Sequence, residues 1–143
     1  MLAKPKILVV DDSTTARNQL CPKLREAGLE VTEASDGSEG LWRAREQQFD
    51  LVLTDIHMPS IDGLAFVQRL RQLPNYKDTP VVALTSDGSV QRREQGRQFG
   101  INAWVIKPPD VPKLVAGLRA VLMSANSDAW EAELASPAQG KRP

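Results

Sequence analysis

Short apolar runs alternate with helical segments along most of this 143-residue chain. Four runs are almost wholly apolar, as expected for strands covered on both faces of a parallel sheet: residues 7–10, 51–53, 81–84 and 103–106. A weaker run at 30–34 alternates polar and apolar side chains, which predicts an edge strand. Five stretches with helical periodicity predict helices between and after these strands: residues 14–27, 38–48, 64–73, 90–99 and 111–123.

This alternation predicts an α/β fold, in which right-handed crossovers build a doubly wound five-stranded parallel sheet with five helices. The length suits one domain, and we expect it to span residues 1–123. Residues 124–143 are mostly small and polar, which predicts a flexible C-terminal tail. Functional groups of such a sheet collect at the carboxyl ends of its strands.

Two predicted helices contain residues that weaken helices. Pro22 lacks a backbone N–H, so we expect it to kink the first helix at a cost of about 3 kcal/mol. The fourth helix, residues 90–99, has few apolar side chains, and Gly96 near its middle costs about 0.5–1 kcal/mol relative to alanine. We therefore expect the fourth helix to be easily displaced.

Charge and cysteine content exclude several classes of function. The 18 basic and 18 acidic side chains cancel, which disfavours DNA or a membrane surface as a partner. Cys21 is the only cysteine, so an internal disulfide and a cysteine-built zinc site are excluded. Residues 7–10 are too short a run for a membrane helix or a signal peptide, and we expect a cytoplasmic protein.

Three carboxylates follow predicted strands. Asp11 and Asp12 come after the first strand, and Asp55 follows the strand at 51–53 with one residue between. Crowded carboxylates repel one another unless a cation neutralises them, and hard oxygen ligands favour Mg²⁺. The sequence therefore predicts a divalent cation, Mg²⁺ or Mn²⁺, at this edge of the sheet.

Hydroxyl and ammonium groups follow two further strands, at Thr85, Ser86 and Lys107. Once a metal ion and Lys107 offset the negative charge, a carboxylate can attack phosphorus while the hydroxyl steadies the phosphoryl oxygens. Asp55 is the best-placed nucleophile. Taken singly, each of these residues also fits a structural role, such as a helix cap or an ion pair.

Four motifs together resemble the receiver domain of two-component response regulators: "VVDDS", "LTDIHMPSIDG", "ALTS" and "WVIKPP". They occur in the family's order over residues 5–123, and the chain looks most like stand-alone chemotaxis regulators of the CheY type. The resemblance implies a flavodoxin-like sheet with strand order 2-1-3-4-5.

The resemblance also implies a role for each matching residue at the acidic site. Asp55 is expected to accept a phosphoryl group from a sensor histidine kinase. Asp11, Asp12, Asp55 and the backbone carbonyl of His57 are expected to hold Mg²⁺, and Lys107 to pair with the phosphoryl group.

Further roles around the site follow from the same resemblance. Thr85 is expected to bond the phosphoryl group, and Trp104, where tyrosine or phenylalanine is more common, to report the conformational switch. The Lys107–Pro108 peptide is expected to be cis. His57 and Asp87 flank the site and are expected to tune the lifetime of the phosphoryl group.

These roles predict a phosphorylation-dependent switch, not an enzyme. Phosphorylation is expected to draw Thr85 inward, make room for Trp104 and change the surface of the fourth helix, fifth strand and fifth helix. We expect a tail and no output domain after Met123, and therefore direct contact with a downstream protein, with a motility-motor component as the leading candidate. A phosphatase is a further candidate partner, and the protein is expected to be a monomer or an activation-dependent dimer.

Three alternatives remain open at the level of sequence. The chain could drain phosphate from a shared kinase, act as a Mg²⁺-dependent phosphatase or phosphotransferase, or serve as a degenerate receiver that only scaffolds. Haloacid-dehalogenase phosphatases carry a second aspartate two residues after the nucleophile, where this chain has His57. Every chemical position of a receiver is filled, which disfavours the scaffold.

Overall fold

The computed structural model describes residues 3–123, so the predicted tail at 124–143 lies outside the described residues. The strands are β1 (Lys6–Val10), β2 (Glu30–Ala34), β3 (Leu51–Thr54), β4 (Val81–Thr85) and β5 (Ala103–Ile106). The helices are α1 (Thr14–Glu26), α2 (Gly37–Glu46), α3 (Gly63–Leu70), α4 (Val90–Gln98) and α5 (Val111–Leu122), with a short 3₁₀ helix η1 (Pro74–Tyr76).

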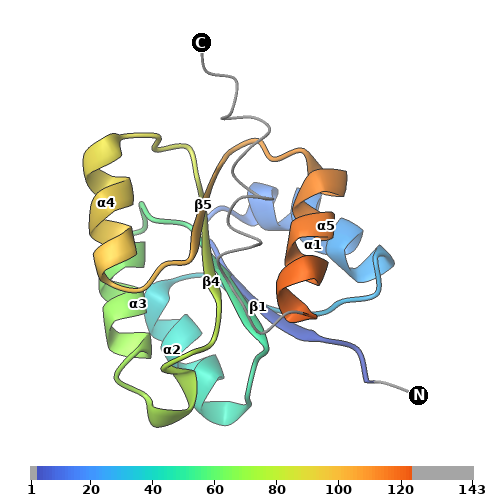
Figure 1. Ribbon diagram of the computed structural model, residues 1–143, viewed down its shortest axis with the longest axis horizontal. Coiled ribbons are helices and arrows are strands. Elements are labelled where there is room, and N and C mark those ends of the chain that lie inside the picture. Colours follow the sequence, from blue (N-terminus) through green and yellow to red (C-terminus); the bar gives the residue numbers. More distant parts are fainter. Residues whose placement is uncertain (1–2, 124–143) are drawn as a thin grey trace.

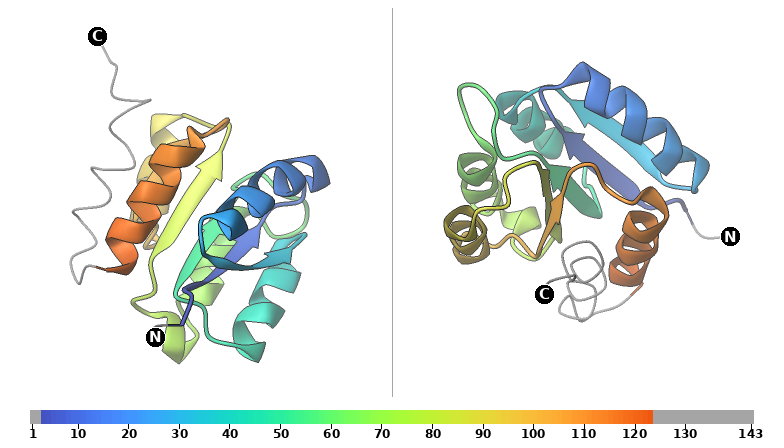
Figure 2. Two further views of the ribbon diagram at one scale, coloured as in Figure 1. Left: turned by 90° about the vertical axis from the view of Figure 1, so that its right-hand side faces the viewer. Right: turned by 90° about the horizontal axis from the view of Figure 1, so that it is seen from above.

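All neighbouring strands pair in parallel, in the order β2-β1-β3-β4-β5. Helices α1 and α5 cover one face of the sheet, and α2, α3 and α4 cover the other (Figures 1 and 2). Each face buries its own apolar cluster, because side chains of successive strand residues point to opposite faces. The predicted fold class and strand order are confirmed, including β2 as an edge strand.

Each α-helix begins with a polar cap that closes the turn after a strand end. Ser13, Asp36, Asp62, Ser89 and Asp110 each accept a hydrogen bond from the backbone N–H three residues later. These caps fix where every helix starts beside the carboxyl edge of the sheet.

Two helices end two or three residues before the predicted position, and the other three end one residue before it. The helix predicted at 64–73 ends at Leu70. Leu73 has extended backbone before Pro74, where η1 begins, because a proline disfavours helical backbone at the residue before it. The helix predicted at 38–48 ends at Glu46. Within residues 3–123, no helix combines the length and the apolar character needed to cross a bilayer.

Helix α1 continues through Pro22 as a single assigned helix. The neighbouring residues Leu20, Cys21 and Leu24 are buried in the cluster beneath α1 and α5. Burying a leucine side chain contributes about 1.5–3 kcal/mol, which offsets the loss of one helical hydrogen bond at Pro22. Packing therefore holds α1 together where backbone preference alone would interrupt it.

The Cys21 thiol is expected to resist alkylation in the folded protein at about pH 8, because the thiolate is the reactive form. Burial raises the pKa of this thiol from 9.0 to about 11. As pH rises, the unfolded chain loses this proton before the folded protein does. The contribution of the protonated thiol to the free energy of unfolding is therefore fully present below pH 9.0 and is lost as pH rises through about 11. Iodoacetamide labelling with and without urea measures the protection, and equal rates in both would contradict it.

Candidate functional site

The carboxyl edge of the sheet gathers polar residues from four elements. Asp11 directly follows β1, Asp55 follows β3, Thr85 ends β4 and Lys107 follows β5. The strand register pairs Val10 with Thr54 and Thr85 with Ile106. The parallel pairing therefore brings the predicted site residues to one edge.

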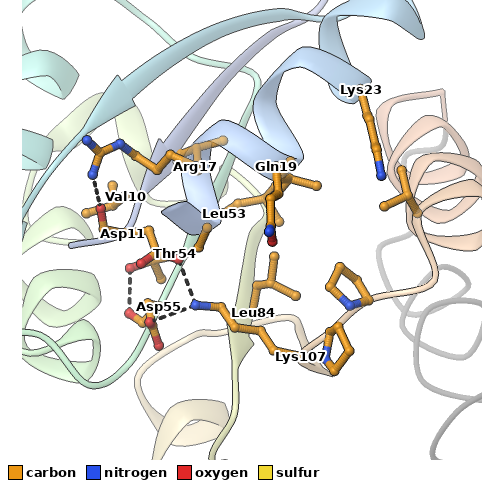
Figure 3. Close-up of a pocket in the computed structure, with 16 residues that line it drawn as sticks. Val10, Asp11, Arg17, Gln19, Lys23, Leu53, Thr54, Asp55, Leu84 and Lys107 are labelled. Atoms are coloured by element: carbon orange, nitrogen blue, oxygen red, sulfur yellow. Dashed lines mark hydrogen bonds and ion pairs between the residues drawn. The ribbon is translucent and has the colours of Figure 1, made fainter. Parts of the chain in front are cut away.

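Lys107 extends its ammonium group between two carboxylates (Figure 3). Its Nζ donates to Oδ2 of Asp11 at 2.8 Å and to Oδ2 of Asp55 at 3.1 Å. The exposed fractions of the side chains are only 22% for Lys107, 8% for Asp11 and 12% for Asp55. Burial opposes the charge of Lys107, but hydrogen bonds to Asp11 and Asp55 outweigh it and raise its pKa. Lys107 thus stays charged at neutral pH.

The second oxygen of each carboxylate is held by the backbone. Oδ1 of Asp11 accepts from the Ser13 N–H at 2.9 Å, and Oδ1 of Asp55 accepts from the Ile56 N–H at 2.6 Å. These backbone hydrogen bonds fix the orientation of both side chains. The two carboxylates are therefore oriented before any ligand arrives.

Arg17 supports the site from α1, a role that the sequence did not reveal. Its Nη1 donates to the backbone carbonyl of Asp11 at 2.5 Å, and its Nε donates to Oε1 of Glu33 at 3.1 Å. Arg17 lies four residues after the Ser13 cap, on the first turn of α1. The position of an arginine one helical turn after the acidic end of β1 was the sequence signal that could have indicated this contact.

Asp11, Asp12 and Asp55 form one acidic cluster. Each offers a carboxylate oxygen, and these oxygens all lie within 4.8 Å of one another. The three carboxylates carry −3 and Lys107 carries +1, which leaves −2 at the site. An all-oxygen donor set with this residual charge fits a hard divalent cation such as Mg²⁺.

Gly63 holds the loop between β3 and α3 against Asp55. A Cβ at this position would overlap the Asp55 carbonyl oxygen, so any side chain would push the loop away. The Gly63 N–H also donates to the Ile56 carbonyl at 2.7 Å. This tight closure places the segment containing His57 beside the acidic cluster.

An apolar cavity of about 210 Å³ opens beside Asp55, between α1 and the connection from β5 to α5. Its walls include Leu20 of α1, Leu84 of β4 and the pair Pro108 and Pro109. The Lys107–Pro108 peptide is cis in the structure. The cavity leads directly to the carboxylates and Lys107 (Figure 3).

His57 and Asp87 meet at the rim of the site. Nε2 of His57 lies 2.6 Å from Oδ2 of Asp87, and Oδ1 of Asp87 accepts from the Ser89 N–H at 2.8 Å. The Ser89 hydrogen bond, followed by that of His57, lowers the pKa of Asp87 to about 2. The sequence suggested both residues as flanks but did not predict that they touch.

Thr85 and Trp104 also contact Asp87, through its backbone. The fully buried Thr85 accepts from the Asp87 N–H at 3.2 Å through Oγ1. The Trp104 side chain is buried, and its Nε1 donates to the Asp87 carbonyl at 2.9 Å. Asp87 therefore connects the two residues predicted to take part in switching.

The arrangement matches a known family over most of the chain. Residues 7–119 match the family model described as the response regulator receiver domain. This chain belongs to the response regulator receiver family. Receiver domains act in two-component signalling, so the chain is a two-component receiver of the CheY-like type.

Curated relatives of this receiver carry two kinds of name. The probable chemotaxis protein CheY of Rhizobium etli is 36% identical over 119 residues, covering 82% of this chain and 92% of the relative. The transcriptional regulatory protein PrrA of Mycobacterium tuberculosis is 38% identical over 128 residues, covering 90% of this chain and 54% of the relative. The chain thus spans about half the length of the transcriptional regulators that it matches.

Solved receiver structures resemble this one closely. Chemotaxis protein CheY4 of Vibrio cholerae has a TM-score of 0.80 and 36% identity, covering 83% of this chain and 99% of that one. The receiver domain of sensor histidine kinase PA1611 from Pseudomonas aeruginosa has a TM-score of 0.79 and 30% identity, covering 85% and 100%. That second structure has a magnesium ion coordinated in its active site cleft.

Proposed function

We propose that Asp55 of this receiver accepts a phosphoryl group from the phosphohistidine of a sensor kinase. The observation that carries the proposal is the contact of Lys107 with both Asp11 and Asp55 beside a third carboxylate, Asp12. Two-component signalling supplies the donor, and the cavity beside Asp55 offers an imidazole a route to the carboxylate. The bond from phosphorus to the histidine nitrogen breaks as the bond to an Asp55 oxygen forms.

The residues around Asp55 divide the work of charge control. Asp11, Asp12, Asp55 and the His57 backbone carbonyl would hold Mg²⁺, which supplies neutralising charge at the phosphoryl oxygens when bound. Lys107 already lies 3.1 Å from Asp55 and pairs with the incoming phosphoryl group. Its raised pKa keeps this cation available throughout the physiological range.

Thr85 reads the phosphorylated state. Its Oγ1 accepts from the Asp87 N–H, which leaves the hydroxyl proton to donate to a phosphoryl oxygen. Movement of Thr85 toward the phosphoryl group pulls on the loop that begins α4. Phosphorylation thereby selects one of two positions of this loop and helix.

The output surface is formed by α4, β5 and α5, and it acts by protein contact. Helix α4 suits this role because Gly96 is its only buried residue, while Val90 is 78% exposed. Control of chemotaxis or motility is the favoured output, since the relatives include the probable chemotaxis protein CheY and the chemotaxis protein CheY4. Binding of the activated protein to DNA instead would redirect this part of the proposal toward transcription.

Incubation with acetyl phosphate and Mg²⁺ tests the proposed function. A receiver switch takes up about one phosphoryl group per chain as a base-labile, acid-stable adduct. Continuous release of phosphate over many turnovers would identify a phosphatase. Absence of any reaction, with the fold intact by circular dichroism, would identify a scaffold.

A further inference from the structure

Helix α4 contacts the sheet at a position that lacks a side chain. Gly96 is the only buried residue of this helix. A Cβ at Gly96 would lie 2.8 Å from Cζ3 of Trp104 and 3.1 Å from Cδ1 of Ile101. The first distance is shorter than real Cβ contacts, and Cζ3 belongs to the rigid indole. The Trp104 ring therefore occupies the space that a side chain at position 96 would need.

Trp104 is held in that space by its polar end. Trp104 is 4% exposed, and its Nε1 donates to the Asp87 carbonyl at 2.9 Å. Phenylalanine has no donor, and the tyrosine hydroxyl lies at a different place on its ring. The bulky indole and the small glycine on the facing helix are therefore a matched pair.

Asp87 connects this pair to the acceptor site. The same residue bonds His57 through its carboxylate at 2.6 Å and Thr85 through its N–H at 3.2 Å. It also holds the Ser89 N–H at the start of α4. One residue thus contacts the rim of the site, the switching threonine, the indole and the first turn of the helix.

We propose that Gly96 is a positioning residue for the switch: it admits the Trp104 indole beneath α4, and Asp87 couples that inward position to Asp55. This inference rests on the proposed function and on the expectation that phosphorylation draws Thr85 inward and makes room for the Trp104 ring. A methyl group at position 96 expels the indole, weakens its bond to Asp87 and disfavours the activated arrangement of the loop. Binding at Asp55 and the position of α4 are then reciprocally linked.

A cycle of variants tests whether Gly96 forms a notch for the indole. Gly96→Ala is expected to lower the urea midpoint when residue 104 is tryptophan and to raise it in the Trp104→Phe background. The rise follows from the better helix propensity of alanine once the larger ring is gone. A Gly96→Ala protein that folds only with Trp104→Phe supports the same conclusion. An equal rise of the urea midpoint in both backgrounds would contradict the claim that Gly96 makes space for the indole.

Beryllofluoride with Mg²⁺, which mimics a phosphoryl group on a carboxylate, tests the coupling. Gly96→Ala is expected to weaken its binding about fivefold or more. Gln95→Ala, at the exposed neighbouring position, is the matched control and is expected to leave the affinity unchanged. Unchanged affinity in Gly96→Ala would overturn the coupling. Failure of the unaltered protein to bind beryllofluoride would instead count against the proposed function, with the stability cycle still deciding the notch.

Discussion

Replacing Lys107 with methionine is expected to lower the free energy of unfolding by about 3–5 kcal/mol in metal-free buffer. The substitution keeps most of the side-chain volume and removes the cation that Asp11 and Asp55 share. Both carboxylates are largely buried, so each would face a like charge without compensation. Domains of this size have total stabilities of about 5–15 kcal/mol, so the loss is a large fraction of the whole.

Urea denaturation with and without Mg²⁺ measures this effect. Lys113→Met, at an exposed position of α5, serves as the control because it removes the same charge away from the cluster. Mg²⁺ is expected to restore more stability to Lys107→Met than to the control, since the ion supplies the missing positive charge. Similar midpoints for the two variants without metal would show that the Lys107 contacts contribute little.

The sequence predicted the site because the ends of apolar runs mark the ends of buried parallel strands. Asp11, Asp55, Thr85 and Lys107 each end or follow an apolar run, and parallel pairing brings those ends to one edge. The order of strands came from the family resemblance, and the pairing confirms it. The gathering of these four side chains is thus a direct consequence of where their strands end.

Contacts between loops, and packing between a helix and the sheet, could not be predicted from the sequence. The His57–Asp87 pair depends on two loop conformations, for which the sequence offers no period. Gly96 was predicted only to weaken α4, because the ring that fills its space comes from β5. The end of α3 at Leu70 was missed because the helical periodicity continues to residue 73 while the backbone turns toward Pro74.

Replacing Asp55 with asparagine is expected to abolish phosphoryl uptake. The amide keeps the shape of the side chain but has no carboxylate oxygen to form an acyl phosphate. Asp11 and Lys107 keep their own 2.8 Å contact, so the fold is expected to survive and even to gain stability from relieved repulsion. Intact mass after incubation with acetyl phosphate, together with a urea midpoint, separates lost chemistry from lost structure.

Asp12→Asn is the matched control for that experiment. Asp12 is an exposed member of the same cluster, so its loss is expected to weaken Mg²⁺ binding but not to remove the acceptor. Uptake at high Mg²⁺ is therefore expected to persist in Asp12→Asn and to be absent in Asp55→Asn. Loss of uptake in both variants at every Mg²⁺ concentration would contradict this division of roles between the two residues.

The most direct measurement is to map the labelled residue after incubation with acetyl phosphate, with Mg²⁺ present or chelated. Borohydride reduction of the acyl phosphate followed by peptide mass spectrometry locates it. The account predicts a single modified residue, Asp55, whose labelling requires the divalent ion. Labelling of Asp55→Asn to the same extent, or equal labelling of the unaltered protein in excess chelator, would contradict it.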